Sequence, residues 1–526
     1  MLAAIRSAAV LGIDAYDVTV EVDCALGLPQ WTIVGLPVGA VKESRERVGA
    51  ALANSGFKLP PRRITVNLAP ADVRKEGTAF DLPIALGILV ATGQLPADAV
   101  RGLAVVGELG LDGAIRAVRG VLPIARSLAE RGGSGEPGRA RSTPMLVAPT
   151  ANRAEAALVA SLRTAAPATL GELVAQLAAG ALVPGESPIP SDFPAADGDA
   201  LDFADVVGQE TAKRAIEVAA AGGHNVLMIG PPGAGKTMLA RRLPSILPAL
   251  DEGEALEATA IHSVAGVLRP GELLMRHGPF RAPHHSISDA GLIGGGNPPR
   301  PGEVSLAHHG VLFLDELPEF RRHVIESLRQ PMEDGRVIIA RAGCAVAFPS
   351  RFTLVGAMNP CPCGNATEPS RVCLCSAADV ARYRGRISGP LADRIDMHVH
   401  VGAVPIATLG ARSTAESSAA VRERVEQARA TQRTRYARLR GVTCNTQVPG
   451  RWLDAHDHLE AGARALLATA ADRLGLTARG YHRVIKVART VADLDGARTV
   501  GVPHAAEALR YRPAPVALGP RAAAHS

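Results

Sequence analysis

Aromatic residues are scarce in this chain. Trp, Tyr and Phe make up only 3% of the 526 residues, whereas apolar residues of all kinds make up 47%. Folded cores must therefore be built mainly from Ala, Val, Leu and Ile, and this apolar content excludes an intrinsically disordered chain. The length predicts about two to four domains.

Long apolar runs and abundant cysteines are also missing. The run from Leu82 to Thr92 is shorter than the roughly 20 residues of a transmembrane helix, which argues against a membrane protein. Met1 to Val10 carries one Arg and a short apolar stretch, so we expect no secretory signal. Four of only seven cysteines lie between 361 and 375, which predicts a cytoplasmic protein with one local metal or redox site rather than a disulfide scaffold.

The clearest motif that is present is a glycine-rich loop at 230–237. It lies between the apolar run 225–229 and the segment 238–242, which predicts a strand, a loop and the start of a helix. Its glycines allow backbone N–H groups to converge on a polyphosphate at the positive end of that helix. We predict that Lys236 reaches the outer phosphates of ATP and that the Thr237 hydroxyl binds Mg²⁺. The predicted nucleotide loop consists of Gly230, Pro231, Pro232, Gly233, Ala234, Gly235, Lys236 and Thr237.

Two further apolar segments end in polar residues that suit ATP hydrolysis. Residues 311–314 predict a buried strand that ends in Asp315 and Glu316. In a Walker B strand the first carboxylate binds Mg²⁺ and the second activates the attacking water, so the second carboxylate predicts hydrolysis. Residues 352–358 predict another strand, after which Asn359 is expected to orient the water.

Residues 1–179 mix strand and helix signals and predict an α+β domain. Helices are expected at 41–55 and 80–91, and the Gly-, Ser- and Arg-rich segment 130–143 predicts a loop. Strands are expected at 15–26, 64–68, 103–109, 117–118 and 145–147, with a hairpin that turns at Gly113.

Three segments of this domain resemble the proteolytic domain of Lon. They are 75–81, 106–109 and 118–123. In that family a Ser nucleophile and a Lys base form the catalytic dyad, but this chain has Ala79 and Leu122 at the matching positions, and neither side chain can attack or move a proton. A register shifted by one residue would make Thr78 the nucleophile, but no lysine lies near position 122 to activate it. The resemblance therefore implies a scaffold for assembly or partner binding and not a protease.

The remaining chain resembles an AAA+ ATPase. The composition changes to Pro, Gly, Ser, Asp and Ala at 180–200, as in an interdomain linker. The segment 203–209, together with the nucleotide motifs, is similar to the start of an AAA+ core. We therefore expect an α/β fold, with a P-loop core built on a parallel sheet at 201–401 and a helical lid at 402–526.

Basic residues and glycines are concentrated between the two nucleotide motifs, at 262–310. For the histidine pairs at 284/285 and 308/309 we favour a surface or interface role over a metal site, because helix-spaced carboxylates are missing. A hairpin is expected at 336–348, with Arg341 near its tip. A basic segment near the centre of a ring suits a polyanion, and the net charge of +6 allows one, so we predict that Arg341 contacts a DNA backbone.

Three longer segments resemble the magnesium-chelatase-like ATPases of the ComM/YifB type. They are 280–286, 301–316 and 359–364, and the resemblance covers essentially the whole chain. It implies a ring, with a homo-hexamer expected, that acts as a DNA helicase on single-stranded or branched DNA and promotes branch migration in recombination or natural transformation. The alternative is a motor subunit of magnesium chelatase, which remodels a partner that inserts Mg²⁺ into a porphyrin. The Lon-like front and the loop cysteines favour the first.

The same resemblance assigns two arginines. Within 386–396, Arg394 matches the arginine that reaches the nucleotide site of the neighbouring subunit and stabilises charge on the transferred phosphoryl group. Hydrolysis would then require a ring. In the predicted helix 478–494, Arg479 matches the sensor 2 arginine of this subunit's own site, with Arg483 as the alternative.

Four cysteines follow Asn359 in two close pairs. Nine residues separate Cys361 and Cys363 from Cys373 and Cys375. Four thiolates suit tetrahedral Zn²⁺, which would hold a polar loop in shape. Because the gap of one residue within each pair is tighter than usual, structural zinc and free thiols stay open as alternatives.

The expected lid is basic. Residues 421–440 contain seven arginines and two glutamates. This segment either follows a phosphate backbone or faces water on the surface of the lid. The Pro- and Ala-rich tail after Tyr511 predicts disorder.

Overall fold

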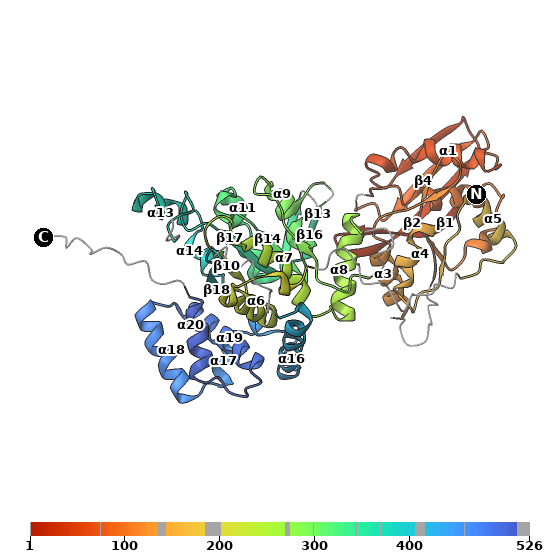
Figure 1. Cartoon of the computed structure of the whole chain (residues 1–526). Helices are drawn as coiled ribbons and strands as arrows, with labels where there is room; N and C mark the ends of the chain where they lie inside the picture. The colour runs from red at the N-terminus through yellow and green to blue at the C-terminus, as the bar shows by residue number, and fades with distance from the viewer. Residues whose placement is uncertain are drawn as a thin grey trace.

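A computed structural model describes the protein in three parts (Figure 1). An N-terminal domain lies at one end, a central core carries the nucleotide motifs, and a helical lid packs against the core. The described residues are 2–73, 75–133, 144–184, 201–268, 274–297, 299–341, 344–367, 371–404, 416–456 and 458–512. Most of the loop predicted at 130–143, most of the linker predicted at 180–200 and nearly all of the predicted disordered tail lie outside these residues.

The N-terminal domain is built on a seven-stranded sheet in the order β3-β4-β2-β1-β5-β8-β9. The strands are β1 (Leu2–Leu11), β2 (Asp14–Ala25), β3 (Gln30–Val34), β4 (Arg63–Ala69), β5 (Leu103–Val105), β8 (Met145–Val147) and β9 (Thr164–Ala165). A separate small hairpin joins β6 (Glu108–Leu109) to β7 (Ile115–Arg116). The helices are α1 (Ser44–Asn54), α2 (Asp81–Ala91), α3 (Val121–Gly133), α4 (Arg153–Ala157) and α5 (Leu170–Ala178).

Helix α2 is the buried centre of this domain. Every one of its eleven residues is buried, as expected for a helix that is apolar on all sides. It packs closely on the sheet at Gly87, where an added Cβ would come within 2.5 Å of Cγ2 of Val22 on β2. The predicted helices and the strands predicted at 15–26, 64–68 and 145–147 are confirmed within a few residues, whereas the central strand β1 and the strands β3 and β9 were missed.

The core is built on a parallel sheet of five strands in the order β11-β14-β17-β10-β18, which confirms the predicted α/β class. The strands are β11 (Phe280–Arg281), β14 (Val311–Leu314), β17 (Thr353–Met358), β10 (Val226–Ile229) and β18 (Met397–His400). In such a sheet ligands bind beyond the carboxyl ends of the strands. The nucleotide loop follows β10, Asp315 follows β14 and Asn359 follows β17, so all three meet at that edge.

Short elements and helices surround this sheet. The helices are α6 (Glu210–Gly222), α7 (Lys236–Ile246), α8 (Glu252–Ala265), α9 (Asp289–Leu292), α10 (Glu303–Leu306), α11 (Arg322–Glu326), α12 (Arg329–Asp334), α13 (Ala377–Arg384) and α14 (Gly389–Ala392). Two further antiparallel pairs join β12 (Gly294–Gly295) to β13 (Arg300–Pro301) and β15 (Arg336–Arg341) to β16 (Cys344–Pro349). The second pair is the predicted hairpin.

The C-terminal part is helical, as predicted. Its helices are α16 (Ser418–Tyr436), α17 (Gly450–Ala455), α18 (Ala461–Leu474), α19 (Ala478–Leu494) and α20 (Val502–Arg510). Helices α16 and α19 pack on α6, so lid and core share one hydrophobic cluster. Within the described ranges, each helix is too short or too polar to cross a membrane.

The N-terminal domain contacts the core through α3 and α8, which lie side by side (Figure 1). The Ser263 hydroxyl of α8 donates a hydrogen bond to the carboxylate of Glu155. The same carboxylate accepts the backbone N–H of Leu122 at 2.9 Å and the Asn152 amide at 2.9 Å. The residue at the expected position of a Lon lysine therefore lies in a structural joint between domain and core.

Candidate nucleotide site

The nucleotide loop has the backbone that its glycines predict. Gly233 and Gly235 have φ angles of 78° and 87°, in the left-handed region that favours glycine, and α7 begins directly after them at Lys236. At Gly230 an added Cβ would come within 2.1 Å of the Val401 carbonyl oxygen. The loop therefore presents the N-terminus of an eleven-residue helix beside the carboxyl end of β10, as phosphate binding requires.

Lys236 and Asn359 meet at this loop. The Lys236 ammonium donates hydrogen bonds to the carbonyl oxygens of Gly230 at 2.7 Å and Pro231 at 3.0 Å, and to Oδ1 of Asn359 at 3.2 Å. Its side chain is 8% exposed, and this burial lowers the pKa of the ammonium, while Asp315 and Glu316 act in the opposite direction. The structure thus brings three separate sequence predictions together at one site.

The hydroxyl of Thr237 donates a hydrogen bond of 2.7 Å to Oδ2 of Asp315. Hydroxyl and carboxylate oxygens are the hard ligands that Mg²⁺ prefers, and magnesium commonly binds one or two such groups together with substrate phosphates. This pair of side chains fits Mg²⁺ carried by ATP.

Glu316 has an unusual backbone conformation. Its φ and ψ are 50° and 45°, and its own N–H donates to Oδ1 of Asp315 at 2.9 Å. A left-handed conformation at a residue other than glycine costs about 1 kcal/mol and is concentrated at functional sites. The side chain is exposed beyond the end of β14, where a carboxylate can reach a water near the phosphates.

Gln209 is a residue of this site whose role the sequence analysis missed. It also has a left-handed backbone, with φ 61°, and its side-chain amide donates to the carbonyl oxygens of Ala234 at 3.1 Å and Gly402 at 2.5 Å. It therefore ties the nucleotide loop to the end of the core. Its place in the segment 203–209, which resembles the start of an AAA+ core, was the available signal.

The predicted arginines gather at the opposite edge of the sheet. Arg394 is buried and its guanidinium lies 2.5 Å from Oε1 of Glu333, while Arg479 lies 3.1 Å from the same oxygen. The Asn225 amide donates to the Arg394 carbonyl oxygen at 3.3 Å. Asn225 precedes β10 and the nucleotide loop follows it, so the arginines lie at the amino ends of the strands.

This arrangement places both Arg394 and Arg479 away from the nucleotide loop of their own chain, which differs from the expectation for Arg479. The expected sensor 2 contact would bring Arg479 to the nucleotide of its own chain, at the other edge of the sheet. The cause is the docking of the lid, which packs α19 on α6. The alternative, Arg483, is bound to Asp396 at 3.0 Å, also at the amino edge.

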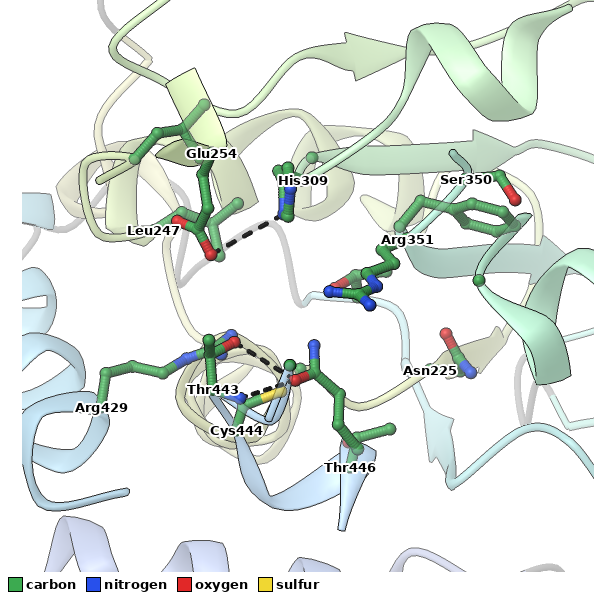
Figure 2. Close-up of a pocket in the computed structure, with 18 of the residues that line it drawn as sticks. Asn225, Leu247, Glu254, His309, Ser350, Arg351, Arg429, Thr443, Cys444 and Thr446 are labelled. Carbon is green, nitrogen blue, oxygen red and sulfur yellow. Dashed lines mark hydrogen bonds and ion pairs between the residues drawn. The ribbon is translucent and has the colours of Figure 1, made fainter. Parts of the chain in front are cut away.

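A polar pocket with a volume of 490 Å³ lies at this same edge (Figure 2), and its lining includes residues that precede β10, β14 and β17. Arg351 and Arg429 face it together with Glu254, His309 and Asn225. The nucleotide loop is not among its lining residues, so this hollow is separate from the ATP site that the motifs form in this chain.

The predicted surface role of the second histidine pair is wrong for His308. Its side chain is 1% exposed, Nδ1 accepts the Arg351 N–H at 2.9 Å, and Nε2 lies 3.1 Å from the Glu257 carboxylate, which His309 also contacts at 3.0 Å. Because Nδ1 accepts, Nε2 carries the proton and donates to Glu257, which leaves His308 without a free nitrogen for a metal. Burial lowers the pKa of His308 to about 4.

The structure describes only part of the region for which DNA contacts were predicted. The hairpin β15–β16 forms with Arg341 paired to Cys344 at its end, but the Arg341 side chain lies outside the described atoms. Within the basic insert, Arg281 is bound to Glu303 by two hydrogen bonds of 2.6 and 2.7 Å. That arginine is therefore held within the core rather than available to a polyanion.

The chain matches three known sequence families along its length. Residues 20–135 match the family described as subunit ChlI of Mg-chelatase, residues 202–409 match magnesium chelatase, subunit ChlI, and residues 415–512 match the ChlI C-terminal family. The competence protein ComM of Haemophilus influenzae is 43% identical over 517 residues, which covers 97% of each chain.

Two further relatives differ in how much of this chain they match. The protein YifB of Escherichia coli is 40% identical over 519 residues, again covering 97% of each chain. The magnesium-chelatase 38 kDa subunit of Rhodobacter capsulatus is 28% identical over 177 residues, which covers 30% of this chain and 50% of that subunit.

Proposed function

The chain belongs to the family of magnesium-chelatase-like AAA+ ATPases that includes ComM and YifB, and we propose that it is an ATP-driven, ring-forming DNA helicase that promotes branch migration. The observation that carries the ATPase part is the meeting of Lys236, Asn359, Thr237 and Asp315 at one edge of the parallel sheet. The DNA part rests on the full-length similarity to a competence protein. We propose that it works in the cytoplasm during recombination or natural transformation.

In the proposed hydrolysis each residue has one task. Backbone N–H groups of the nucleotide loop bind the phosphates, and Lys236 leaves its carbonyl partners to neutralise the outer ones. Thr237 and Asp315 hold Mg²⁺. Glu316 accepts a proton from the attacking water, which Asn359 orients.

A ring, with a homo-hexamer as the proposed assembly, completes the site. Arg394 and Arg479 lie at the amino edge of the sheet, and in a ring this edge of one subunit would face the nucleotide of the next. We propose that Arg394 stabilises charge on the transferred phosphoryl group of the neighbour and that Arg479 assists there rather than in its own site.

The domain assignment is part of the same proposal. Separate sheets support an N-terminal domain at 1–179 and a core at 201–401, joined by a linker at 180–200 and followed by a lid at 402–526. Ala79 and Leu122 offer neither a nucleophile nor a base, so we propose that the first domain is a scaffold and not a protease. We propose that the protein uses ATP and Mg²⁺, and that its four loop cysteines hold one zinc ion.

The test uses the full chain with single-stranded, duplex and forked DNA in the presence of a non-hydrolysable ATP analogue. Binding should favour single-stranded or branched DNA and weaken steeply with salt, because neutralised phosphates release counterions. A three- or four-stranded junction should be resolved only with hydrolysable ATP and Mg²⁺. Arg341→Ala should reduce DNA-stimulated hydrolysis and leave ATP binding unchanged, whereas Arg101→Ala, an exposed arginine of the N-terminal domain, should change neither. A ring that neither binds DNA nor is stimulated by it at low salt contradicts the helicase.

The alternative is a magnesium-chelatase motor subunit. The local similarity to the 38 kDa chelatase subunit supports it, but that similarity covers only 30% of this chain. This alternative requires hydrolysis that ignores DNA and responds to a porphyrin-binding partner. The same ATPase assay, with and without each DNA, distinguishes the two.

A further inference from the structure

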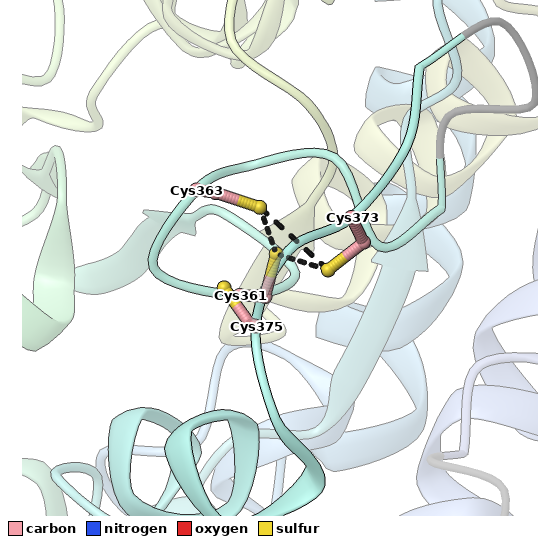
Figure 3. A group of neighbouring side chains, drawn as sticks. All are labelled: Cys361, Cys363, Cys373 and Cys375. Atoms are coloured by element: carbon pink, nitrogen blue, oxygen red, sulfur yellow. Dashed lines mark hydrogen bonds between the residues drawn. The ribbon is translucent and has the colours of Figure 1, made fainter.

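Four sulfur atoms converge directly after Asn359 (Figure 3). Sγ of Cys361 lies 3.4 Å from Sγ of Cys363 and 3.7 Å from Sγ of Cys373, and the latter two are 3.6 Å apart. Cys375 completes the group, and all four Sγ atoms lie within 4.8 Å of one another. With zinc–sulfur bonds of about 2.3 Å, the ligands of a tetrahedral zinc lie about 3.8 Å apart, so these separations fit one zinc ion.

The local backbone explains the tight spacing within each pair. Exposure alternates along the second pair: Val372 and Leu374 are 78% and 88% exposed, whereas Cys373 and Cys375 are half-buried. Residues two apart in an extended segment point to the same side, so a gap of one residue directs both thiols inward. The first pair lies in a turn, in which the Gly364 N–H donates to the Cys361 carbonyl oxygen at 3.0 Å.

Hydrophobic packing does not account for the shape of this loop. Its described residues between β17 and α13 form neither a helix nor a strand, and the large apolar side chains of Val372 and Leu374 face solvent. A polar loop without a core of its own needs a cross-link to hold one conformation, and a metal bound by four thiolates supplies one.

The same loop touches the nucleotide loop at two points. Asn359, two residues before Cys361, accepts the hydrogen bond from Lys236. Gly364 packs on Pro232, where an added Cβ would come within 2.5 Å of Cδ. A cross-link at the cysteines would therefore fix Asn359 and Gly364 against the residues that hold ATP.

We propose that Cys361, Cys363, Cys373 and Cys375 form a structural zinc site that holds the Asn359 loop against the nucleotide loop. Binding exchanges the thiol protons for one Zn²⁺ and involves no change in oxidation state. The metal site stands independently of the proposed ATPase, but its effect on ATP binding rests on that proposed function.

The first test measures metal in the full chain purified without chelator. Elemental analysis should find about one zinc per chain, and after zinc removal Co²⁺ alone should restore one equivalent with the strong charge-transfer absorption of cobalt thiolates. Cys363→Ser removes an exposed ligand and should lose most of the metal, while Cys24→Ala, on β2 of the N-terminal domain, should keep it. Protein that carries no zinc and takes up no Co²⁺ overturns the site, whatever the fate of the serine variant.

The second test separates the brace from the metal. Gly364→Ala keeps all four thiols but pushes against Pro232, so zinc should stay near one per chain while ATP affinity falls about tenfold or more. Gly56→Ala is the matched control, because Gly56 has a similar φ of 84° with no atom within 4 Å of an added Cβ. Unchanged ATP affinity in Gly364→Ala overturns the brace. Zinc-loaded wild-type protein that fails to hydrolyse ATP would instead contradict the proposed function and leave the metal site standing.

Discussion

At the scale of single residues, replacing the basic Lys236 and replacing the acidic Glu316 should impair the nucleotide site in different ways. Lys236→Ala removes the cation that meets the phosphates and should abolish ATP binding. Glu316→Gln keeps the site able to bind but removes the proton acceptor, so ATP should stay bound while hydrolysis falls at least about a hundredfold. Binding of a fluorescent ATP analogue and phosphate release measure the two steps. Normal turnover in either variant would remove the role assigned to that residue.

His308 should make the stability of the core depend on pH. Its pKa is about 4 in the folded protein and about 6.5 when unfolded, so the unfolded chain binds more protons between these values. The contribution is complete above pH 6.5 and is lost as the pH falls toward 4, by about 3 kcal/mol. Glu257, whose pKa is held below its usual range mainly by its hydrogen bond from His308, acts in the same direction.

Thermal unfolding between pH 4 and 8 checks this dependence. His308→Gln keeps a donor toward Glu257 and should lower Tm at neutral pH but flatten its fall with acid. His284→Gln, which changes an exposed ring, should leave the wild-type profile intact. An unaltered slope in His308→Gln would show that other groups control the acid transition.

At the scale of the element, the structure answers a question that composition left open for 421–440. Four of its seven arginines are used within the chain. Arg422 and Arg429 donate to carbonyl oxygens of Ser245 and Ala220 at 2.8 Å, and Arg424 and Arg435 bind Glu217 and Asp493 at 2.6 and 2.5 Å. Helix α16 therefore neither follows a phosphate backbone with these residues nor leaves them in water. Arg422, Arg424 and Arg429 attach the lid to the core, and Arg435 binds α16 to α19 within the lid.

The C-terminal end of α12 should restrain the arginines that the proposed ring needs. Glu333 binds both Arg394 and Arg479, and the pKa of its carboxyl is lowered chiefly by Arg394. Arg394 is buried in this pair, but Glu333 and Arg479 are exposed, and an exposed ion pair is worth about 0.5 to 1 kcal/mol. Glu333→Gln should therefore free the guanidinium groups and raise hydrolysis in the assembled ring about two- to fivefold. Glu416→Gln removes a comparable ion pair to Arg424 away from this cluster and should not. Slower hydrolysis in Glu333→Gln would make Glu333 part of the productive arrangement.

At the scale of the whole molecule, the proposed ring can be tested by mixing subunits. Arg394→Ala and Lys236→Ala spoil opposite edges of the sheet, so each variant alone should be inactive. In a mixed ring some interfaces pair an intact nucleotide loop with an intact arginine, and about a quarter of wild-type hydrolysis should return at equal amounts if subunits mix at random. Two variants that assemble together without any recovery would show that Arg394 does not act between subunits.

Local chemistry was predictable from this sequence and long-range placement was not. The roles of the nucleotide loop, Asp315 and Asn359 could be predicted from the residues next to them in the sequence, and the structure brings these groups together. The first strand was missed because its alanines lack the β-branched character of a typical strand, although it pairs with β2 along ten residues. The position of Arg479 beside Glu333, at the amino edge of the sheet, was not expected, because no local sequence pattern reports how a lid docks on α6.

The hydrogen bonds of Glu155 between the N-terminal domain and the core also limit which substitutions the protein can accept nearby. Its carboxylate holds Leu122 of α3 and Ser263 of the ATPase core at the same time. A Ser at 79 and a Lys at 122 would put an ammonium group into a fully buried position, next to the carboxylate that hydrogen-bonds both domains. Building a Ser-Lys dyad at these two positions would therefore require the contacts around Glu155 to be rebuilt first.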